Sequence, residues 1–385
     1  MQKLNIIGLN SGTSLDGVDA AICSIEKRDK FYINYLNGTV LDYPDIFRKK
    51  LKKILTNNSI GLYDLCMINA QLGDYFLDAT KKIIKESSLN LSDIHLIGSH
   101  GQTFWHSPNK VNFLGRPTKA TLQLGDPSII AEKTKIPVVC DFRVQDICAD
   151  GQGAPLIAFL DKVLFGSDNI SSGILNVGGI ANITYINSRN QVKMAFDTGP
   201  GNMIIDQAAK LLYGKEYDEN GYLASLETYD KDTLDELMQS KYFSQTPPKT
   251  TGRELFGYTY ANDLLNKLDK YKLSKEKIMA TVTAFTAYSI CDAYKKFILS
   301  EEPITRLIIS GGGAYNKTII KLLHDFFPHK IDIISHDLFN IPIKFKEAVL
   351  FALLAYTRYF EIPNNIPLIT GAKSKVIMGK IIKPY

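Results

Sequence analysis

The sequence predicts an α/β protein made of two related lobes that face one another. Two stretches carry the same order of three short apolar strands followed by a helix, one from residue 4 and the other from about residue 173. In each stretch, small residues occupy the first turn. The chain has 385 residues, of which 45% are hydrophobic and 22% are charged, as is typical of a globular protein of about two to three domains.

The first stretch opens with apolar runs that predict strands and continues with helical periodicity. The strands are expected at 4–9, 17–25 and 31–41, with turn residues from Asn10 to Ser14 after the first of them. Apolar residues at helical spacing from Leu62 to Ile83 predict a long helix that ends near Ser87. Short strands at 94–99 and 136–141 follow this helix.

The second stretch repeats this order. We expect strands at 173–177, 182–186 and 192–196, and then a helix whose apolar face extends from Met203 to Leu212. The remaining predicted elements are a helix at 277–299, a strand at 306–310, a helix at 316–327, a strand at 331–335 and a helix at 344–360. The repeat is one of pattern and not of sequence identity.

The composition disfavours nucleic acid, membranes and disulfides as determinants of function. Lys and Arg number 45 against 40 Asp and Glu, a net charge of only +5, and no basic stripe is interleaved with aromatic residues. No run approaches about 18 uncharged apolar residues, so we expect no membrane-spanning helix. The five cysteines are widely spaced without a CxxC pair, which disfavours a structural zinc site. Because no signal peptide is recognisable, the expected compartment is the cytoplasm.

Three glycine-containing turns could hold phosphate: Ser11 to Gly17, Gly178–Gly179 and Gly311–Gly313. Glycine lets the backbone approach a ligand closely and point its N–H groups at an anion. Ser and Thr hydroxyls add donors, and Asp16 could hold the waters of a magnesium ion. Each turn taken alone is also compatible with an ordinary tight turn. Since a GxxxxGK[ST] P-loop and a GxGxxG fingerprint are both missing, a Rossmann dehydrogenase is disfavoured.

Two charged residues follow strands at positions suited to chemistry. Asp197 stands at the end of a predicted strand, before a glycine-flanked turn and a helix, where a carboxylate can act as a general base. The alternative is that Asp197 caps the turn or the helix. Arg143 follows another strand, between Asp141 and Asp146, and its guanidinium suits recognition of a carboxylate or phosphate. An ordinary ion pair is the alternative for Arg143.

His100 and His106 lie close together in the sequence, and we expect them to hydrogen-bond or to position other groups. Zinc would require further ligands at close spacing, and the HExxH motif is not present. A satisfied core histidine is the alternative for His106. Nucleophilic catalysis is disfavoured, because the chain has no GxSxG elbow and no cysteine in an evidently electropositive loop.

An ordered set of motifs resembles the anhydro-N-acetylmuramic acid kinases, a family of the sugar kinase/actin/heat-shock-chaperone ATPase superfamily. Together the motifs span nearly the whole chain. They are GLNSGTSLDGVD at 8–19, GSHGQT at 98–103, DFR at 141–143, GQGAPL at 151–156, NVGG at 176–179, FDTGPGN at 196–202, PPKTTGRE at 247–254, GGGAYN at 311–316 and TGA at 370–372.

The resemblance implies two actin-like (ribonuclease-H-like) lobes with a deep interlobe cleft. The N-terminal lobe would cover 1–143, completed by 372–385, and the C-terminal lobe 144–371. The implied enzyme uses ATP and Mg²⁺ to open 1,6-anhydro-N-acetylmuramic acid with water and to phosphorylate its O6. The product, N-acetylmuramic acid 6-phosphate, would enter peptidoglycan recycling and amino-sugar catabolism. The resemblance leaves a homodimer open.

The resemblance also implies roles for residues that match the family's motifs. Asp197 would deprotonate the water that attacks the anomeric carbon, and Glu347 would lie near the sugar and that water. The sugar would be bound by His100, Gln102, Arg143 and Asn202. ATP would be bound by Gly12, Thr13, Ser14, Leu15, Asp16, Gly17, Val18, Asp19, Gly178, Gly179, Gly311, Gly312 and Gly313.

One position departs from the family's pattern: this chain has Asp150 where the family usually has the first glycine of Gly-Gly-Gln-Gly-Ala-Pro-Leu. That carboxylate would alter the local charge or simply face solvent. Two other functions stay open. An ordinary sugar kinase of the superfamily would use Asp197 to deprotonate a sugar hydroxyl, and no water would enter the product. A nucleotide-driven protein such as actin or a chaperone would turn over ATP slowly, coupled to a protein partner.

Overall fold

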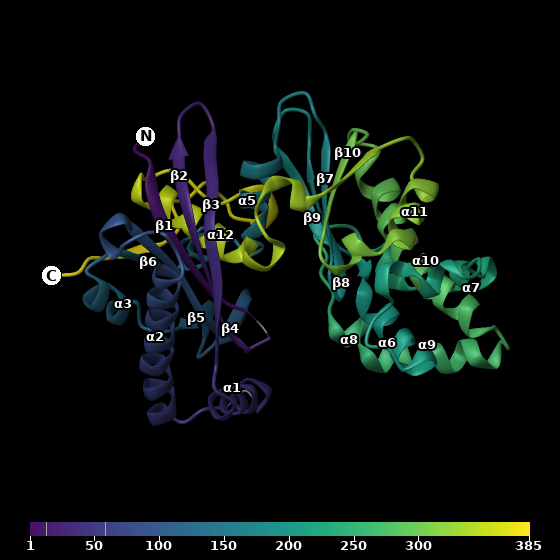
Figure 1. Ribbon diagram of the computed structural model, residues 1–385, viewed down its shortest axis with the longest axis horizontal. Helices are drawn as coiled ribbons and strands as arrows, with labels where there is room; N and C mark the ends of the chain where they lie inside the picture. Colours follow the sequence, from purple (N-terminus) through teal and green to yellow (C-terminus); the bar gives the residue numbers. More distant parts are fainter. Residues whose placement is uncertain (13, 58) are drawn as a thin grey trace. The chain divides into compact units, whose positions relative to one another are not determined.

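Two separate β-sheets organise the chain, one in each of two units (Figure 1). This computed structural model describes residues 1–12, 14–57 and 59–385, with Arg253 described by its backbone only. Unit 1 comprises Met1–Leu164 and Asn340–Tyr385, and unit 2 comprises Phe165–Phe339. Thr13, one of the predicted ATP-binding residues, lies outside the described residues.

Unit 1 contains a seven-stranded mixed sheet. Its strands are β1 (Leu4–Ser11), β2 (Gly17–Lys27), β3 (Phe31–Asp42), β4 (Leu96–Phe113), β5 (Arg116–Leu124), β6 (Val138–Cys140) and β12 (Lys380–Ile382). They lie in the order β12-β6-β4-β1-β2-β3, and β5 pairs with β4. The strands β1 to β3 form an antiparallel meander, whereas β1, β4 and β6 are parallel.

Helices cover both faces of the unit 1 sheet. Ile6 and Ile7 are consecutive in β1 and belong to two different hydrophobic cores, as the alternation of side chains along a strand requires. Helix α2 (Leu62–Lys85) contributes to the core of Ile7, and α12 (Lys346–Tyr359) contributes to the core of Ile6. A strand buried on both faces reads as a continuous apolar run, which is why β1 and β2 are recognisable from sequence. The other helices that begin in unit 1 are α1 (Asp45–Asn57), α3 (Pro127–Thr134), α4 (Val144–Cys148), α5 (Ile157–Phe165) and α13 (Pro367–Thr370).

Unit 2 contains a five-stranded sheet with the same topology as the central strands of unit 1. Its strands are β7 (Ser172–Val177), β8 (Ile180–Ile186), β9 (Val192–Pro200), β10 (Arg306–Ser310) and β11 (Asp332–Ser335). The order β11-β10-β7-β8-β9 matches β6-β4-β1-β2-β3, and the parallel and antiparallel pairs correspond. The predicted repeat is therefore confirmed as a repeated topology, and with it the α/β fold class.

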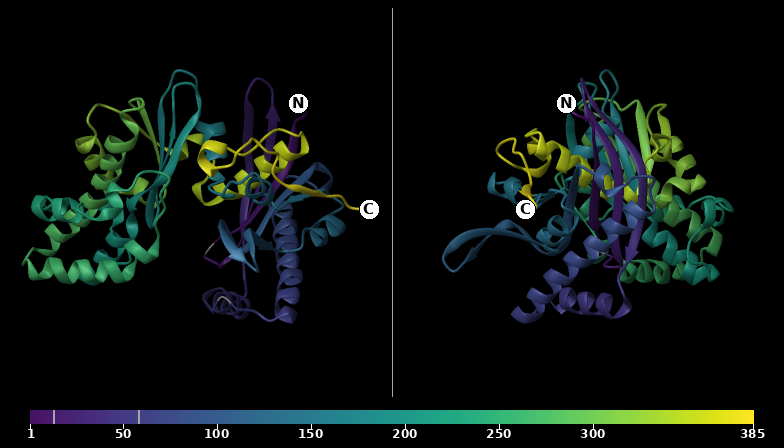
Figure 2. Two further views of the ribbon diagram at one scale, coloured as in Figure 1. Left: turned by 180° about the vertical axis from the view of Figure 1, so that it is seen from behind. Right: turned by 60° about the vertical axis from the view of Figure 1, so that its left-hand side comes forward.

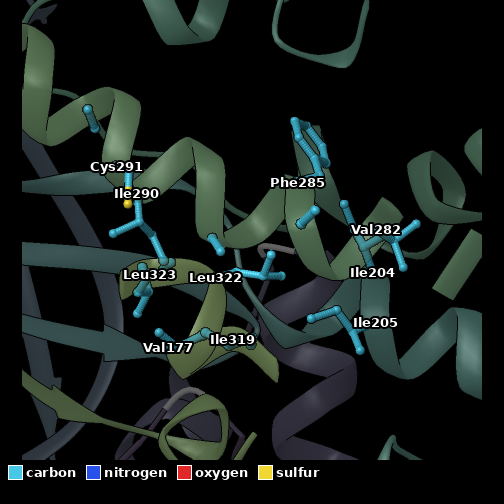
Figure 3. Close-up of a cluster of buried hydrophobic side chains, with 14 of the residues drawn as sticks. Val177, Ile204, Ile205, Val282, Phe285, Ile290, Cys291, Ile319, Leu322 and Leu323 are labelled. Atoms are coloured by element: carbon cyan, nitrogen blue, oxygen red, sulfur yellow. The ribbon is translucent and has the colours of Figure 1, made fainter. Parts of the chain in front are cut away.

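Three helices, α6 (Asn202–Tyr213), α10 (Lys275–Ala293) and α11 (Lys317–Phe326), contribute to the main hydrophobic core of unit 2 (Figure 3). The labelled members of this core are Val177, Ile204, Ile205, Val282, Phe285, Ile290, Cys291, Ile319, Leu322 and Leu323. Helix α10 continues into a π-helical turn at Tyr294–Ile298. The remaining helices are α7 (Lys231–Leu237), α8 (Arg253–Phe256) and α9 (Tyr258–Lys270). None of the described helices is long and apolar enough to cross a membrane.

One strand differs strongly from the expectation. The predicted strand at 94–99 is β4, which continues to Phe113 and pairs with β5 in a hairpin (Figure 2). Most residues in the outer part of this hairpin are half-buried or exposed. The apolar contrast that marks a strand in sequence is therefore weak there.

The two compact units have other bounds than the predicted lobes, 1–143 completed by 372–385 and 144–371, and that division into lobes stays a prediction. The chain passes between the units after Leu164 and returns at Asn340. The reason is packing, because side chains of α5 and α12 share one hydrophobic core with Ile6 of β1.

Candidate active site

A cavity of about 480 Å³ with polar and apolar lining residues lies in unit 1, where the end of β1 and the first half of β4 meet the first turn of α12. It is lined by Asn10, Ser11, Gly12, Ser14, Asp19, His100, Gln102, Thr103, Arg143, Ala154, Pro155, Leu156, Ile157, Glu347, Leu350 and Phe351. Residues predicted separately for ATP and for the sugar therefore share one cavity. The lining residues come from segments more than 300 residues apart in the sequence; Glu347, which was predicted, and Asn10, which was not, are 337 residues apart.

The turn after β1 forms one wall of this cavity. The Ser11 hydroxyl is within hydrogen-bond distance of Gln102 Oε1, at 2.6 Å, and Ser14 Oγ donates to Asp16 Oδ1 at 2.6 Å. At Gly12 an added Cβ atom would meet only Ser14 Oγ, at 3.9 Å. The backbone at Gly12 is therefore accessible from the cavity.

Four other predicted residues of this turn do not line the cavity, and one of them, Asp16, is exposed. Leu15 and Val18 are buried in the hydrophobic core beneath α2. A Cβ atom at Gly17 would overlap the backbone of Leu41 in β3. The structure thus gives Leu15, Gly17 and Val18 packing roles.

Asp19 brings a crowded carboxylate to the cavity. Burial raises its pKa to about 6, the nearby carboxylates of Asp16, Glu347 and Asp42 act in the same direction, and Lys344 opposes them. On the other side, Asn10 Nδ2 donates to Glu347 Oε2 at 2.5 Å. This end of the cavity is therefore rich in negative charge.

Arg143 supplies the cationic side of the cavity. Its Nε donates to His100 Nε2 at 3.0 Å, and its Nη1 donates to the Gly153 carbonyl at 2.7 Å. Burial lowers the pKa of Arg143 to about 10, and Glu347 opposes this shift, so the guanidinium stays charged at neutral pH. Among the described residues, the main interactions of Arg143 are these two hydrogen bonds, and not the ordinary ion pair considered as the alternative.

His100 holds this arginine as a neutral ring. Burial, and then the charge of Arg143, lower the pKa of His100 well below its usual range. The ring stacks on Phe351 with centroids 4.5 Å apart. His106, by contrast, does not line the cavity; its Nδ1 lies 3.0 Å from Thr121 Oγ1 in the β4–β5 hairpin.

Asp146 organises the loop that holds Arg143, a role that sequence reasoning missed. The side chain is fully buried. Its Oδ2 accepts from the Gly153 N–H at 2.7 Å, and its Oδ1 accepts from Asn365 Nδ2 at 2.8 Å and Thr370 Oγ1 at 2.7 Å. No local signal could have shown this, because two of the partners lie 219 and 224 residues away.

Asp150, the departure from the family's pattern, is paired with lysines. Its Oδ2 lies 2.6 Å from Lys373 Nζ and its Oδ1 3.2 Å from Lys110 Nζ. These lysines lower the pKa of Asp150 to about 2. The backbone φ of Asp150 is +68°, a left-handed conformation that glycine adopts most readily.

In unit 2, the other two glycine turns meet around Asn202, the first residue of α6. Asn202 N donates to the Gly178 carbonyl at 2.7 Å, and its Nδ2 donates to the Val177 carbonyl at 3.1 Å. A Cβ atom at Gly312 would lie 2.9 Å from Asn202 Nδ2. Gly311 has a φ of +82° and sits against the Val177 carbonyl, so a side chain is excluded there.

A second polar cavity, of about 530 Å³, adjoins these glycines in unit 2. It is lined by Asn202, Ile205, Asp206, Tyr217, Asp218, Glu219, Asn220, Gly312, Tyr315 and Asn316. Burial, and then the charge of Asp218, raise the pKa of Asp206 to about 6. Asp206 and Asp218 were not predicted, because each is an isolated acid outside the recognised motifs.

Asp197 lies near the end of β9 and is held by three hydrogen bonds. Its N–H donates to the Lys249 carbonyl at 3.1 Å, the Tyr242 hydroxyl donates to its carbonyl at 2.7 Å, and the Thr251 N–H donates to its Oδ2 at 2.8 Å. Burial raises the pKa of the carboxyl, the Thr251 N–H opposes this shift, and Glu254 reinforces it.

Asp197 does not cap the helix that follows it. The N-cap of α6 is Gly201, which makes no side-chain cap. The carboxylate instead takes its hydrogen bond from the loop before α8. The capping alternative is therefore wrong for α6.

A family model described as anhydro-N-acetylmuramic acid kinase matches residues 4–384. The chain belongs to this family. A relative named anhydro-N-acetylmuramic acid kinase from Caldanaerobacter subterraneus subsp. tengcongensis is 40% identical over 381 residues, covering 98% of this chain and 96% of the relative. One of the same name from Bacillus cereus strain G9842 is 37% identical over 383 residues, covering 98% and 99%.

Solved structures resemble the chain more distantly. Component A of the (R)-2-hydroxyglutaryl-CoA dehydratase of Acidaminococcus fermentans aligns with a TM-score of 0.46 and 10% identity over 92% of this chain and 98% of that one. A ROK hexokinase from Thermus thermophilus aligns with a TM-score of 0.39 and 12% identity over 92% and 100%. Likenesses this distant bear on neither substrate nor mechanism.

Proposed function

We propose that this chain is an ATP-dependent kinase that opens 1,6-anhydro-N-acetylmuramic acid with water and phosphorylates the freed O6. The products are N-acetylmuramic acid 6-phosphate and ADP. The observation that carries this proposal is membership of the anhydro-N-acetylmuramic acid kinase family over residues 4–384. The unit 1 cavity supports it, since it combines polar groups able to hydrogen-bond to a sugar, a cation and an accessible glycine turn.

The sugar is bound in the unit 1 cavity. The acid group of this muramic acid sugar is a carboxylate, which the buried guanidinium of Arg143 can recognise. Gln102 and Asn10 can hydrogen-bond to sugar oxygens. The neutral ring of His100 accepts a hydrogen bond from Arg143 Nε and so fixes the position of the guanidinium.

Asp197 is the general base of the hydrolytic step. It takes a proton from the water, whose oxygen forms a bond to the anomeric carbon while the bond from that carbon to O6 breaks. A raised pKa suits a carboxylate to this task, because a base acts best when its pKa approaches the operating pH. Glu347 orients the water or the sugar. O6 then attacks the γ-phosphorus, and ADP leaves.

ATP is bound by the glycine turns. Phosphoryl transfer depends mainly on positioning and on neutralising charge, and backbone N–H groups at Gly12 and at Gly311 to Gly313 supply both. The unit 2 cavity beside Gly312 accepts the nucleoside end. Asp206 and Asp218 can accept hydrogen bonds from the ribose hydroxyls there.

The β1–β2 turn and the start of β2 carry carboxylates that fit a magnesium ion. Mg²⁺ is usually held by one or two carboxylates together with substrate phosphates and water, and no cluster of three or more protein ligands occurs in the described part of the chain. Asp16 and Asp19 would hold the ion. Burial raises the pKa of Asp19 and the neighbouring carboxylate of Asp16 adds to this shift, and a divalent cation would offset the negative charge of the two carboxylates. When bound, Mg²⁺ neutralises charge on the phosphates.

The test is a product assay in ¹⁸O-water with ATP, magnesium and the anhydro sugar, read by mass spectrometry. We expect a 6-phosphate that carries one ¹⁸O at the anomeric hydroxyl when it is analysed before exchange. An ordinary sugar kinase would transfer phosphate to hexoses without label. A nucleotide-driven assembly protein would release ADP slowly whether or not the sugar is present.

A further inference from the structure

Lys249 is a buried lysine whose ammonium group lies in an aromatic cage. Only 6% of the residue is exposed. Its Nζ lies 4.6 Å from the ring centroid of Tyr242, 4.9 Å from that of Phe297 and 5.9 Å from that of Phe196. It also donates to the Tyr242 carbonyl at 3.2 Å. Aromatic faces stabilise a cation in this position, and no carboxylate among the described residues pairs with it directly.

The segment 247–251, which contains Lys249, also makes hydrogen bonds to Asp197. The Lys249 carbonyl accepts from the Asp197 N–H, and two residues later the Thr251 N–H donates to the Asp197 carboxylate. Tyr242, whose ring covers the ammonium, donates its hydroxyl to the Asp197 carbonyl. The cage, the segment 247–251 and the carboxylate are therefore one connected structure.

The charges around this structure are few. Burial lowers the pKa of Lys249 to about 8; Lys296 adds to this shift and Asp292 opposes it. Asp292 and Lys296 pair with each other at 2.7 Å. On Asp197, the Thr251 N–H favours the ionised carboxylate, whereas burial and Glu254 oppose it.

We propose that Lys249 is a positioning residue for Asp197. Its caged ammonium fixes the segment 247–251, and this keeps the Thr251 N–H on the Asp197 carboxylate. The inference rests on the proposed function only in taking Asp197 as the base. Without the caged ammonium of Lys249, the Thr251 N–H would leave the Asp197 carboxylate more often, and the protonated form of Asp197 would persist to higher pH.

The experiment titrates the Thr251 amide by NMR in the full-length protein, because this N–H reports the ionisation of Asp197 directly. Lys249→Met removes the charge and keeps a long apolar side chain in the cage. We expect it to move the titration midpoint upward by about 0.5 to 1 pH unit. Lys249→Arg retains the cation and should keep the wild-type midpoint. Lys241→Met, at an exposed lysine eight positions earlier, is the matched control and should also leave the midpoint unchanged.

Kinetics provide the second measurement. The acid limb of kcat/KM against pH should move upward in Lys249→Met by the same amount as the amide midpoint, with a fall in kcat and little change in the KM for ATP. An unmoved midpoint in Lys249→Met overturns the proposal, even if the variant melts at a lower temperature. The proposal is also overturned if Lys249→Arg shifts the amide midpoint as far as Lys249→Met does.

Two further comparisons keep the test decisive. If Lys249→Met does not fold, Lys249→Gln takes its place and must shift the midpoint while Lys249→Arg does not. If Asp197→Asn stays active, Asp197 is not the base and that part of the proposed function fails. The amide titration would still decide whether Lys249 positions the Asp197 carboxylate.

Discussion

Gly8 of β1 and Gly98 of β4 lie directly opposite each other in the parallel strand pair, and α12 crosses both. A Cβ atom at Gly8 would overlap the carbonyl oxygen of Ala348, and one at Gly98 would overlap that of Phe351. The two glycines therefore let the backbone of α12 rest on the sheet. This close approach brings Glu347, in the first turn of α12, to Asn10.

The first prediction follows from this contact. Gly98→Ala should lower the free energy of unfolding by about 1–3 kcal/mol, since an added methyl group must displace α12. It should also lower kcat, because Glu347 moves with the helix. Urea unfolding and steady-state assays measure the two effects. Gly61→Ala is the control, since nothing lies within 4 Å of an added Cβ there; because Gly61 is the N-cap of α2, it should cost up to about 1 kcal/mol and leave kcat unchanged. A kcat that Gly98→Ala lowers no more than Gly61→Ala does would contradict the prediction.

Asp197→Asn should leave ATP binding nearly intact and lower kcat by about 10²–10⁴-fold, the usual contribution of a general base. The amide keeps the size of the side chain and can still accept the Thr251 N–H. Calorimetry with ATP measures the binding, and a turnover assay at saturating substrates measures kcat. Retention of more than about a tenth of the activity would rule out Asp197 as the base.

Gly12→Val should raise the KM for ATP without lowering the melting temperature. The space beside Gly12 belongs to the cavity and not to the core, so the new side chain blocks the ligand and leaves the packing intact. Thermal melts and ATP titrations are the measurements. An unchanged affinity for ATP in the folded variant would place the nucleotide elsewhere.

Asp146→Ala should cost more than about 2 kcal/mol of stability, because it removes the side-chain acceptor of the buried Gly153 N–H and one of the acceptors of the Asn365 amide and of the Thr370 hydroxyl. It should also raise the KM for the sugar, since Gly153 holds Arg143. Lys133→Ala, at an exposed lysine of α3, provides a reference for an ordinary surface change. A sugar KM equal to that of wild type would separate Asp146 from Arg143.

Asp19 should make the ligand-free protein less stable as the pH rises. Its pKa is about 6 in the folded protein against an ordinary value of 3.8, so between these values the folded state binds more protons, and stability falls as pH increases. Asp19→Asn should therefore raise the melting temperature at pH 7 and have little effect near pH 4. Melts across pH 4 to 7 check this, and a larger gain at pH 4 than at pH 7 would contradict it.

Much of the fold could be predicted from sequence, and the reasons lie in particular elements. The strand predicted at 306–310 is β10 with the same bounds, because three consecutive buried apolar residues, Leu307 to Ile309, mark it. The outer half of β4 could not be predicted, since its exposed residues satisfy no apolar period. The predicted interlobe cleft, homodimer and cytoplasmic location remain predictions.

The candidate site, too, could be predicted from the sequence only in part. Gly12, Asp19, Arg143 and Glu347 could be named because they stand in motifs of the family, and the structure brings them to one cavity. Their assigned roles stay predictions. Asp146 could not be assigned, because its importance depends on partners that only the folded chain brings near. Lys249 stands within a recognised motif, yet its aromatic cage is invisible in the sequence.

The discontinuity of unit 1 has a consequence for the order of events during synthesis. Unit 2 is one uninterrupted segment, Phe165–Phe339, whereas unit 1 waits for Asn340–Tyr385. Helix α12 covers one face of its sheet, and β12 pairs with β6. Domains generally fold as units as the chain emerges from the ribosome. Here the second unit in the sequence can complete its core first, while β1 to β6 must wait with one apolar face uncovered.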